Sequence, residues 1–413
     1  MWGLGAALYL IGFFHRVAPA VITSELMVEF GIGAAALGNL SAFYFYSYVG
    51  MQIPTGVLAD HWGPRRVLCA GAGIATVGSL LFAMAPGYGL AAAGRFLVGA
   101  SVGVAFVAML KIAHHWFPPD RFAQLSGLAL LCGLVGAVGA GAPLRSLANA
   151  FGWRPVMVAI AAASALLAAL IWWLVRDDPT EKGYRSYAAH LHATATPHSM
   201  MGGVIEALRF RNVWLIFVVA GGATAPMLAF VGLWAVPFLT AHYGMTTTQA
   251  ALLTSATLIG WAVGGPALGW ISDRYRRRKI PYYAGLILCT AAFAVLFIVP
   301  GLPRAALVAL FLVAGLASGC VIIGFAWAKE SAPAALAGTS TGIANMGTML
   351  GGLLMQPLIG WVLDRNWDGA VANGARIYDF AAYRSGFMLL LAWLVLSLVL
   401  LAFIRDTHCR QQA

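Results

Sequence analysis

Long apolar stretches separated by short polar joints dominate the chain. A membrane-spanning helix needs ~20 mostly apolar residues, because the hydrocarbon core of a bilayer is about 30 Å thick. Windows of this length recur from one end of the sequence to the other and predict about twelve spans. We expect them at residues 3–24, 35–59, 67–86, 89–112, 122–145, 154–175, 213–240, 247–271, 282–300, 305–329, 337–362 and 384–404. The pattern predicts an all-α membrane protein.

One long polar segment, residues 176–212, separates the sixth span from the seventh. Its charges and its lack of a long apolar face indicate a solvated linker, with a short surface helix at 202–210. We therefore expect an N-terminal six-helix bundle at 1–175, a cytoplasmic linker at 176–212 and a C-terminal six-helix bundle at 213–413.

Composition and charge agree with a membrane protein. Only 9% of the residues are charged, against about a quarter in a soluble domain. The net charge of +11 does not indicate a nucleic-acid partner, because the basic residues lie at the ends of apolar runs. Most belong to joints on one side of the predicted membrane, and the other side holds Arg145, Arg154, Arg304, Arg365, Arg376 and Arg384. This asymmetry predicts a multi-pass protein of the bacterial inner membrane with both termini cytoplasmic.

The two halves of the chain share a motif. "IPTGVLADHWGPRR" follows the second predicted span, and "GPALGWISDRYRRRK" follows the eighth. In each, a proline lies two residues before a glycine, and that glycine lies four before an aspartate. The aspartates, Asp60 and Asp273, are about half the chain apart. Such a repeat is typical of a transporter built from two matching bundles.

The first copy resembles the signature that joins helices two and three of the major facilitator superfamily, broadly G-x-L-A-D-R-x-G-R-R. The copy at 269–279 resembles its counterpart between helices eight and nine. "GRFLVG" at 94–99, which contains Arg95, is similar to the fourth-helix signature, and "FGWR" at 151–154 to the entry of the sixth helix. The resemblance covers essentially the whole chain. It implies twelve helices in two pseudo-symmetric bundles, a secondary transporter, a monomer and no cofactor.

The motif residues are expected to form a cytoplasmic gate. Charge clusters at such joints hold the two halves together when the transporter faces outward and separate when it faces inward. The positive-inside rule alone also explains the arginines. His61 stands where the family usually has arginine, which places one latch contact in doubt. The expected gate residues are Gly56, Asp60, Gly63, Arg65, Arg66, Gly269, Asp273 and Arg274.

Arg16 is the main candidate for substrate binding. An ionisable residue in a span is costly and marks a functional site by default, and Pro19 nearby can free backbone groups beside a cavity. A guanidinium suits a carboxylate or a phosphate; the alternative is an arginine bonded to neighbouring carbonyls. "GFFHRVAP" also resembles the first helix of the organic-anion and organophosphate branches, where an arginine contacts the substrate. Possible further contacts, each of which packing also explains, are Tyr44, Tyr48, Gln52, Trp234, Trp261 and Asn345.

A coupling ion, a proton or Na⁺, has few candidate carriers. Related anion symporters have an acidic residue seven positions after the fourth-helix arginine, where this chain has Val102. His15 remains, as does Glu330 beside Lys329, a pair that is also explained by mutual neutralisation. Symport, exchange and facilitated diffusion all stay open.

The sequence therefore predicts a secondary active transporter for a small organic anion. The alternatives are an exporter of drugs or amphipathic compounds, a lipid flippase, or a sensor that binds without transport. "GASVG" at 99–103 matches a hydrolase motif, but the motif needs a strand–turn–helix context, so we expect a packing face of Gly99 and Gly103 and no enzyme or metal site. The basic run at 274–279 is more simply interpreted as the inner joint after the eighth span than as a lipid or nucleic-acid site.

Overall fold

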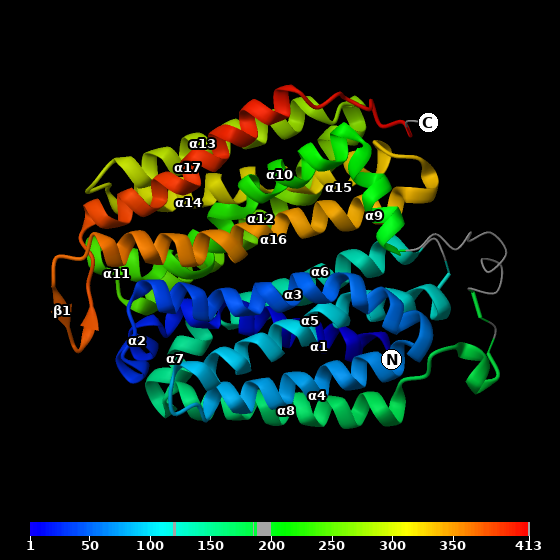
Figure 1. The fold of residues 1–413 in the computed structure, drawn as a ribbon, viewed down its shortest axis with the longest axis horizontal. Helices are drawn as coiled ribbons and strands as arrows, with labels where there is room; N and C mark the ends of the chain where they lie inside the picture. Colours follow the sequence, from blue (N-terminus) through cyan, green and yellow to red (C-terminus); the bar gives the residue numbers. More distant parts are fainter. Residues whose placement is uncertain (119–120, 185, 188–199, 412–413) are drawn as a thin grey trace. The chain divides into compact units, whose positions relative to one another are not determined.

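The computed structural model describes residues 1–118, 121–184, 186–187 and 200–411 (Figure 1). In this part of the chain, 10 helices are long and apolar enough to cross a membrane, or up to 12 if each of two bent pairs is one span. One pair is α2 (Thr23–Phe30) with α3 (Ala34–Trp62), bent by 112°. The other is α6 (Phe122–Gly139) with α7 (Ala142–Phe151), bent by 40°. The predicted all-α membrane fold is confirmed.

The remaining spans follow the predicted windows to within a few residues. They are α1 (Trp2–Val17) with the 3₁₀ turn η1 (Ala18–Val21), α4 (Pro64–Ala83), α5 (Tyr88–Trp116), α8 (Trp153–Leu174), α10 (Arg211–Ala225) continued by η4 (Pro226–Trp234) and α11 (Ala235–Tyr243), α12 (Thr247–Tyr275), α13 (Lys279–Ile298), α14 (Arg304–Ser318) with α15 (Val321–Glu330), α16 (Ala337–Arg365) and α17 (Phe380–Ala402). Short 3₁₀ turns lie at η3 (Pro179–Lys182) and η5 (Ala334–Leu336).

Two elements were not anticipated from hydropathy. The stretch η4 is a π-helix that begins at Pro226, a residue without the N–H that an α-helix needs. Strands β1 (Val371–Ala372) and β2 (Ala375–Arg376) form an antiparallel hairpin. The dipeptide Asn373-Gly374, both residues with positive φ, supplies the tight turn that such hairpins favour.

The chain divides into two compact units. The first contains Met1–Ile22 and Phe43–Pro197, and the second contains Thr23–Ala42 and His198–Ala413. The units follow the two halves of the sequence, except that residues 23–42 pack with the second unit. Helix α3 therefore begins in one unit and continues in the other.

In the first unit, α4 packs between α5 and α8, and α1 packs against α5 and α6 (Figure 1). Gly99 lets α5 approach α3 closely, since a Cβ atom there would lie 2.0 Å from the Tyr44 carbonyl oxygen. A Cβ on Gly103 would lie 2.9 Å from that of Met51. Both glycines lie within a helix, so the predicted packing face is confirmed.

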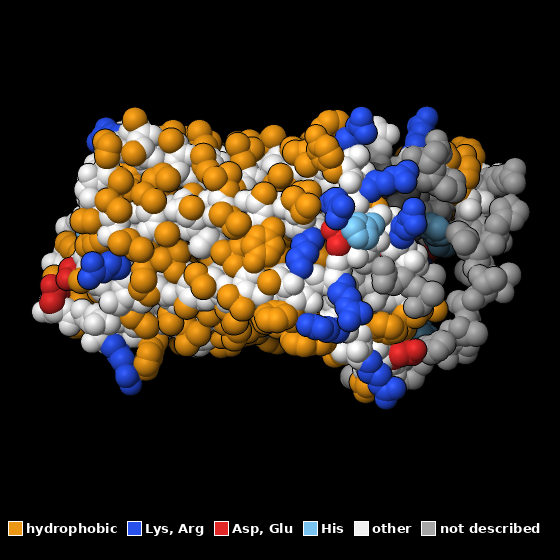
Figure 2. Space-filling model, turned by 90° about the horizontal axis from the view of Figure 1, so that it is seen from above, with side chains coloured by type: hydrophobic (Ala, Val, Ile, Leu, Met, Phe, Trp, Pro, Cys, Tyr) orange, Lys and Arg blue, Asp and Glu red, His pale blue; other side chains and the backbone are white. Residues whose placement is uncertain are grey.

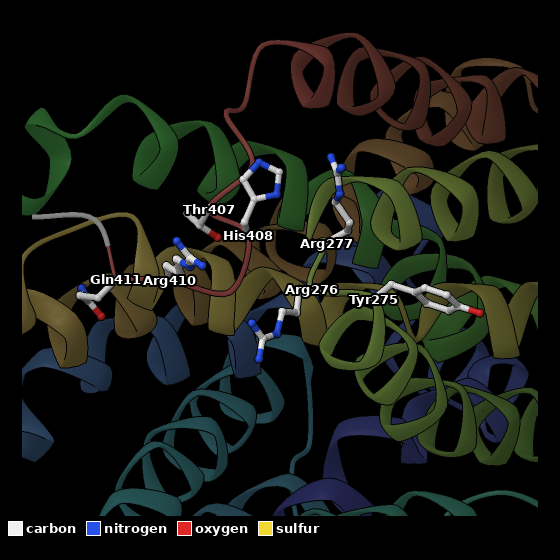
Figure 3. A pocket seen from close by; sticks show the side chains of 7 residues that line it. All are labelled: Tyr275, Arg276, Arg277, Thr407, His408, Arg410 and Gln411. Atoms are coloured by element: carbon white, nitrogen blue, oxygen red, sulfur yellow. The ribbon is translucent and has the colours of Figure 1, made fainter.

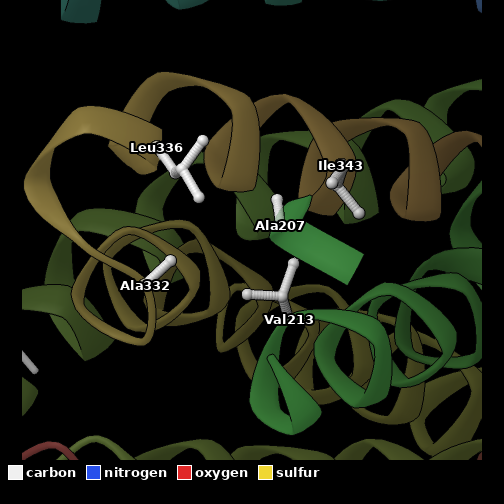
Figure 4. Packing of buried hydrophobic residues seen from close by; sticks show 5 residues of the cluster. All are labelled: Ala207, Val213, Ala332, Leu336 and Ile343. Atoms are coloured by element: carbon white, nitrogen blue, oxygen red, sulfur yellow. The ribbon is translucent and has the colours of Figure 1, made fainter. Parts of the chain in front are cut away.

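In the second unit, α10 packs against α16 and α17, and α14 packs against α12 and α13. Helix α9 (Met200–Arg209) occupies the predicted position of the linker helix. It is not fully solvated as expected, because a hydrophobic cluster anchors it to the neighbouring helices (Figure 4). The cluster consists of Ala207, Val213, Ala332, Leu336 and Ile343.

The surface is that of a protein surrounded by lipid. On the face drawn in Figure 2, hydrophobic side chains cover the middle, and lysine and arginine side chains gather toward the ends. Exposed apolar residues such as Leu288, Val395 and Val399, each at least half exposed, belong to the spans α13 and α17. In water such surface would be costly, whereas in a bilayer it contacts acyl chains.

Asp364, at the end of α16, caps the first turn of α3 inside the second unit. Its carboxylate accepts hydrogen bonds from the backbone N–H groups of Ala34 (3.1 Å) and Ala35 (2.8 Å). The Tyr378 hydroxyl donates to the same carboxylate at 2.6 Å, and Arg376 forms an ion pair with it at 3.2 Å. A carboxylate at a helix N-terminus satisfies orphan donors and complements the helix dipole.

We expect Asp364→Asn to lower the free energy of unfolding by about 1–2 kcal/mol, the usual cost of losing a charged N-cap. Asp368→Asn is the matched control, because Asp368 is exposed and accepts only a local bond from Ala370. Thermal unfolding in detergent measures both. Equal effects of the two substitutions would show that the cap contributes nothing beyond surface charge.

Candidate functional site

Arg16 lies at the end of α1, in the first unit. Its side chain is only 8% exposed, and its guanidinium carbon lies 5.0 Å from the ring centre of Phe13 and 5.3 Å from that of Phe45. Within the described part of the chain, its Nη2 atom has no hydrogen-bond partner. A buried cation held between two rings with a free donor is a site prepared for an anion.

Two tyrosines lie near this guanidinium, and a third stacks on one of them. Arg16 interacts electrostatically with the side chains of Tyr9 and Tyr44. The hydroxyl of Tyr44 donates to the Gly12 carbonyl at 3.2 Å, and its ring stacks on Tyr48 at 6.2 Å. The structure therefore brings Arg16, Tyr44 and Tyr48 together.

The change from α-helix to 3₁₀ turn at the end of α1 has a clear cause. In a continuous helix the His15 carbonyl would accept a bond from the N–H of residue 19, but residue 19 is proline and has none. A guanidinium nitrogen of Arg95 on α5 donates to this carbonyl instead. Arg95 is 1% exposed and also lies over the Tyr44 ring, at 5.4 Å. The fourth-helix arginine thus completes the break beside Arg16.

This arrangement predicts thermodynamic coupling between Arg95 and Pro19. Arg95→Met leaves a buried carbonyl without its donor and is expected to cost about 1–3 kcal/mol. In a Pro19→Ala background the new N–H at position 19 can take over, so the same substitution should cost at least ~1 kcal/mol less. A double-mutant cycle of thermal unfolding measures the difference. Additive effects would rule out the shared carbonyl.

His15 faces away from solvent in the same region. Its Nε2 atom lies 2.8 Å from the Ser79 hydroxyl, and the side chain is 1% exposed. His15, a candidate for ion coupling, directly precedes Arg16 in the sequence, and its carbonyl is the one that accepts the bond from Arg95. Gln52, further along α3, is half-buried in the same unit.

The other predicted contacts belong to the second unit. The indole N–H of Trp234 donates to the Gln356 carbonyl at 3.2 Å, and the Gln356 side chain donates to the Leu228 carbonyl at 2.8 Å. The indole of Trp261 donates to the Ser318 carbonyl at 3.2 Å. Trp234 and Trp261 thus hold neighbouring helices together, while Asn345 is half-buried on α16.

The joint of the first unit runs through Gly63. Its φ of +78° and the Asp177 carboxylate, 2.4 Å from where a Cβ would lie, both require glycine. Asp177 accepts a bond from the Arg65 backbone N–H at 2.5 Å, and the Arg65 side chain donates to the Trp172 carbonyl. Arg66 is exposed. The predicted gate positions Gly56 and Asp60 lie outside the residues whose side-chain surroundings are described.

The joint of the second unit has a comparable cap, in which a carboxylate binds the backbone at the start of α13. Arg276 takes the position of Gly63 and also has positive φ, 49°. Asp406 accepts from the backbone N–H groups of Arg278 (3.1 Å) and Lys279 (3.3 Å). The side chain of Arg278 pairs at 2.6 Å with both Asp273 and Glu330. Burial alone would lower the pKa of Arg278, but these hydrogen bonds outweigh burial and raise it.

Several expected partners differ from those observed. Asp273 was expected to act with Arg274, yet it pairs with Arg278, while Arg274 is exposed. Glu330 was weighed as the partner of Lys329, yet its carboxylate binds Arg278, and Lys329 is exposed. Gly269 lies on α12, where a Cβ would meet only Ile322, at 3.6 Å.

Sequence reasoning missed Asp177 and Asp406, the two carboxylates that cap the third helix of each half. A signal was present, since "RD" follows both the sixth and the twelfth span, at Arg176-Asp177 and Arg405-Asp406. Extending the repeat beyond the glycine–aspartate motif would have found them.

Asp178, next to this cap and outside the spans, makes stability depend on pH. Burial raises the pKa of its carboxyl, but hydrogen bonds from Thr180, Ser186 and His115 outweigh burial and lower it below the ordinary value. A lowered pKa stabilises the fold above the unfolded-state pKa of about 4 and loses this effect as pH falls further. We expect Asp178→Asn to lower the unfolding temperature by about 2–4 °C at pH 7 and the difference to shrink below pH ~4. An unchanged difference at low pH would contradict this origin.

Known proteins resemble the chain over most of its length. It is 27% identical over 381 residues to an uncharacterised transporter of Bacillus subtilis, covering 87% of this chain and 86% of that protein. It is 25% identical to a probable sulfoacetate transporter of Cupriavidus necator (72% and 71% covered) and 24% identical to a probable galactarate/D-glucarate transporter of Escherichia coli (88% and 86%). The solved structure of a nucleoside transporter matches with a TM-score of 0.73 at 14% identity, covering 98% of both chains.

The family comparison agrees with the repeated joints and with the 10 to 12 apolar spans of the described chain. The family model of the Major Facilitator Superfamily matches residues 3–354 and again 227–412. Its members are transporters and not enzymes. The chain belongs to the Major Facilitator Superfamily of membrane transporters.

Proposed function

We propose that the chain is a secondary active transporter that moves a small organic anion, a carboxylate or phosphate ester, across the bacterial inner membrane by alternating access. The observation that carries the proposal is the buried guanidinium of Arg16, whose Nη2 atom has no partner in the described part of the chain. A charge in an apolar span needs a counter-charge, and an anionic substrate supplies it.

Two further observations support an anion. The Arg95 bond to the His15 carbonyl fixes the helix break that ends at Arg16, so the binding group is held in place before the substrate arrives. The relatives named for sulfoacetate and for galactarate/D-glucarate are named for small carboxylates. The proposed polar contacts of the substrate are Tyr44, Tyr48, Gln52 and Asn345.

His15 is the proposed carrier of a coupling proton. It is the titratable side chain adjacent to Arg16, and the unperturbed pKa of a histidine lies near physiological pH. Glu330 is a weaker candidate, because its carboxylate is taken by Arg278.

A binding screen tests the substrate class. The purified protein is heated with sulfoacetate, D-glucarate, 4-hydroxybenzoate, glycerol 3-phosphate, an amino acid or a lipophilic cation. A ligand that binds only the folded state adds ~2.7 kcal/mol of stability at a hundredfold excess over its Kd. We expect stabilisation by one anion class that is lost in Arg16→Ala. Stabilisation by the lipophilic cation in both proteins would instead support the exporter.

A further inference from the structure

A cavity of about 730 Å³ lies in the second unit, where the C-terminal tail passes the joint between α12 and α13 (Figure 3). Both segments contribute basic side chains. Arg276 and Arg277 come from the joint, and His408 and Arg410 come from the tail. No carboxylate is among the described residues that line it.

The three arginines of this cavity are unpaired. Throughout the described ranges, the side chains of Arg276, Arg277 and Arg410 take part in no hydrogen bond and no ion pair. Their neighbour Arg278 is the opposite case, buried and paired with two carboxylates. Arg278 therefore stabilises the joint, whereas Arg276, Arg277 and Arg410 remain available to bind an anion.

The nearby acidic groups are already engaged and do not neutralise the cavity. Asp273 and Glu330 pair with Arg278. The Asp406 carboxylate accepts from the backbone N–H groups of Arg278, Lys279 and His408.

The backbone around the cavity is strained and firmly held. Three of the four non-glycine residues with positive φ in the described chain lie here, namely Arg276 (49°), His408 (53°) and Cys409 (59°). Such conformations persist where the surroundings enforce them, often at ligand clamps. Thr407 donates to Glu330 at 2.5 Å, and Gln411 donates to the Lys329 carbonyl at 3.1 Å, so the tail is tied to the end of α15.

We propose that this cavity binds a phosphate group, of the kind carried by anionic phospholipid headgroups and by soluble phosphates. Clustered guanidinium groups suit phosphate oxygens, and basic pockets at the membrane surface bind anionic headgroups. Tyr275 (72% exposed) and Ile280 (62% exposed) border the joint on α12 and α13. In Figure 3 Tyr275 extends away from the arginines. An acyl chain along these helices would place its headgroup at the cavity.

The experiment removes the charges and compares two phosphate sources. The full-length protein in dodecylmaltoside is titrated with phosphatidylglycerol, and separately with inorganic phosphate, at constant ionic strength. Native mass spectrometry counts bound lipid, and calorimetry measures phosphate binding. The pocket variant is Arg276→Gln, Arg277→Gln and Arg410→Gln together. The control is Arg121→Gln, Lys182→Gln and Arg209→Gln, which removes the same charge from exposed residues outside the cavity.

We expect the pocket variant to bind phosphatidylglycerol at least tenfold more weakly than wild type, and the control to change less than threefold. If inorganic phosphate also binds wild type, competes with the lipid and fails to bind the pocket variant, the site takes soluble phosphates as well. If the pocket variant loses binding of inorganic phosphate but binds phosphatidylglycerol as the wild type does, the site takes soluble phosphate and not a lipid headgroup. Equal losses in pocket and control variants, or no loss with either probe, would overturn the site. None of these readouts depends on the substrate bound at Arg16.

Discussion

Arg16→Ala is expected to reduce uptake of the anionic substrate about 100-fold. A paired guanidinium–anion contact in a buried site is worth roughly 3 kcal/mol, which corresponds to about two powers of ten in affinity. Arg16→Lys keeps the charge but loses the planar fork, so we expect an intermediate loss of about tenfold. Uptake into proteoliposomes of the anion identified by the binding screen measures all three proteins.

The control for this prediction is Arg384→Ala, an arginine on α17 that is exposed. It removes the same charge and should leave uptake within a factor of two. The folded fraction of each variant is checked by its unfolding temperature. If Arg16→Ala folds normally and transports at the wild-type rate, the anion is bound elsewhere and the proposed role of Arg16 fails.

Arg278→Met is expected to cause the largest loss of stability, about 3–5 kcal/mol, because removing one partner of a buried ion pair leaves the other charge uncompensated. The side chain of Glu330 is 13% exposed and would keep only its bond from Thr407. Asp273, at 68% exposed, loses little. Denaturation of the detergent-solubilised protein measures the cost.

Two further variants test whether the loss of stability comes from the uncompensated charge of Glu330. Adding Glu330→Gln to Arg278→Met removes the stranded charge and should restore part of the stability. Arg277→Met, one residue away and unpaired, should change it by less than about 0.5 kcal/mol in phosphate-free buffer. If Arg278→Met is no worse than Arg277→Met, the buried network does not hold the joint.

The spans and the repeated joints could be predicted because their signals are local. About 20 apolar residues in a row specify a bilayer helix whatever its neighbours, and the repeat of Asp60 in Asp273 shows that the halves match. The break of α1 was likewise visible in Pro19. The bend of 112° between α2 and α3 and the packing of residues 23–42 with the second unit were not, because they depend on contacts with α16 that are distant in sequence.

Side-chain partners were harder to predict than helices. Asp273 was matched with its sequence neighbour Arg274, but the positive φ of Arg276 turns the chain back and brings Arg278 to it instead. Likewise, the adjacency of Lys329 and Glu330 suggested a pair, yet neighbouring residues on a helix point in different directions. For Arg16, the sequence indicated a functional cation, and only the packing of Phe13 and Phe45 revealed that it is buried with a free donor.

Gly63 and Arg276 occupy matching positions in the two joints, and both have positive φ. Their ψ angles differ, however, at 154° for Gly63 and 42° for Arg276, and only the second conformation lies in the left-handed region that a residue with a side chain adopts. The two halves of this chain therefore turn at the same place with different backbone conformations, and only the joint at Gly63 needs a glycine there.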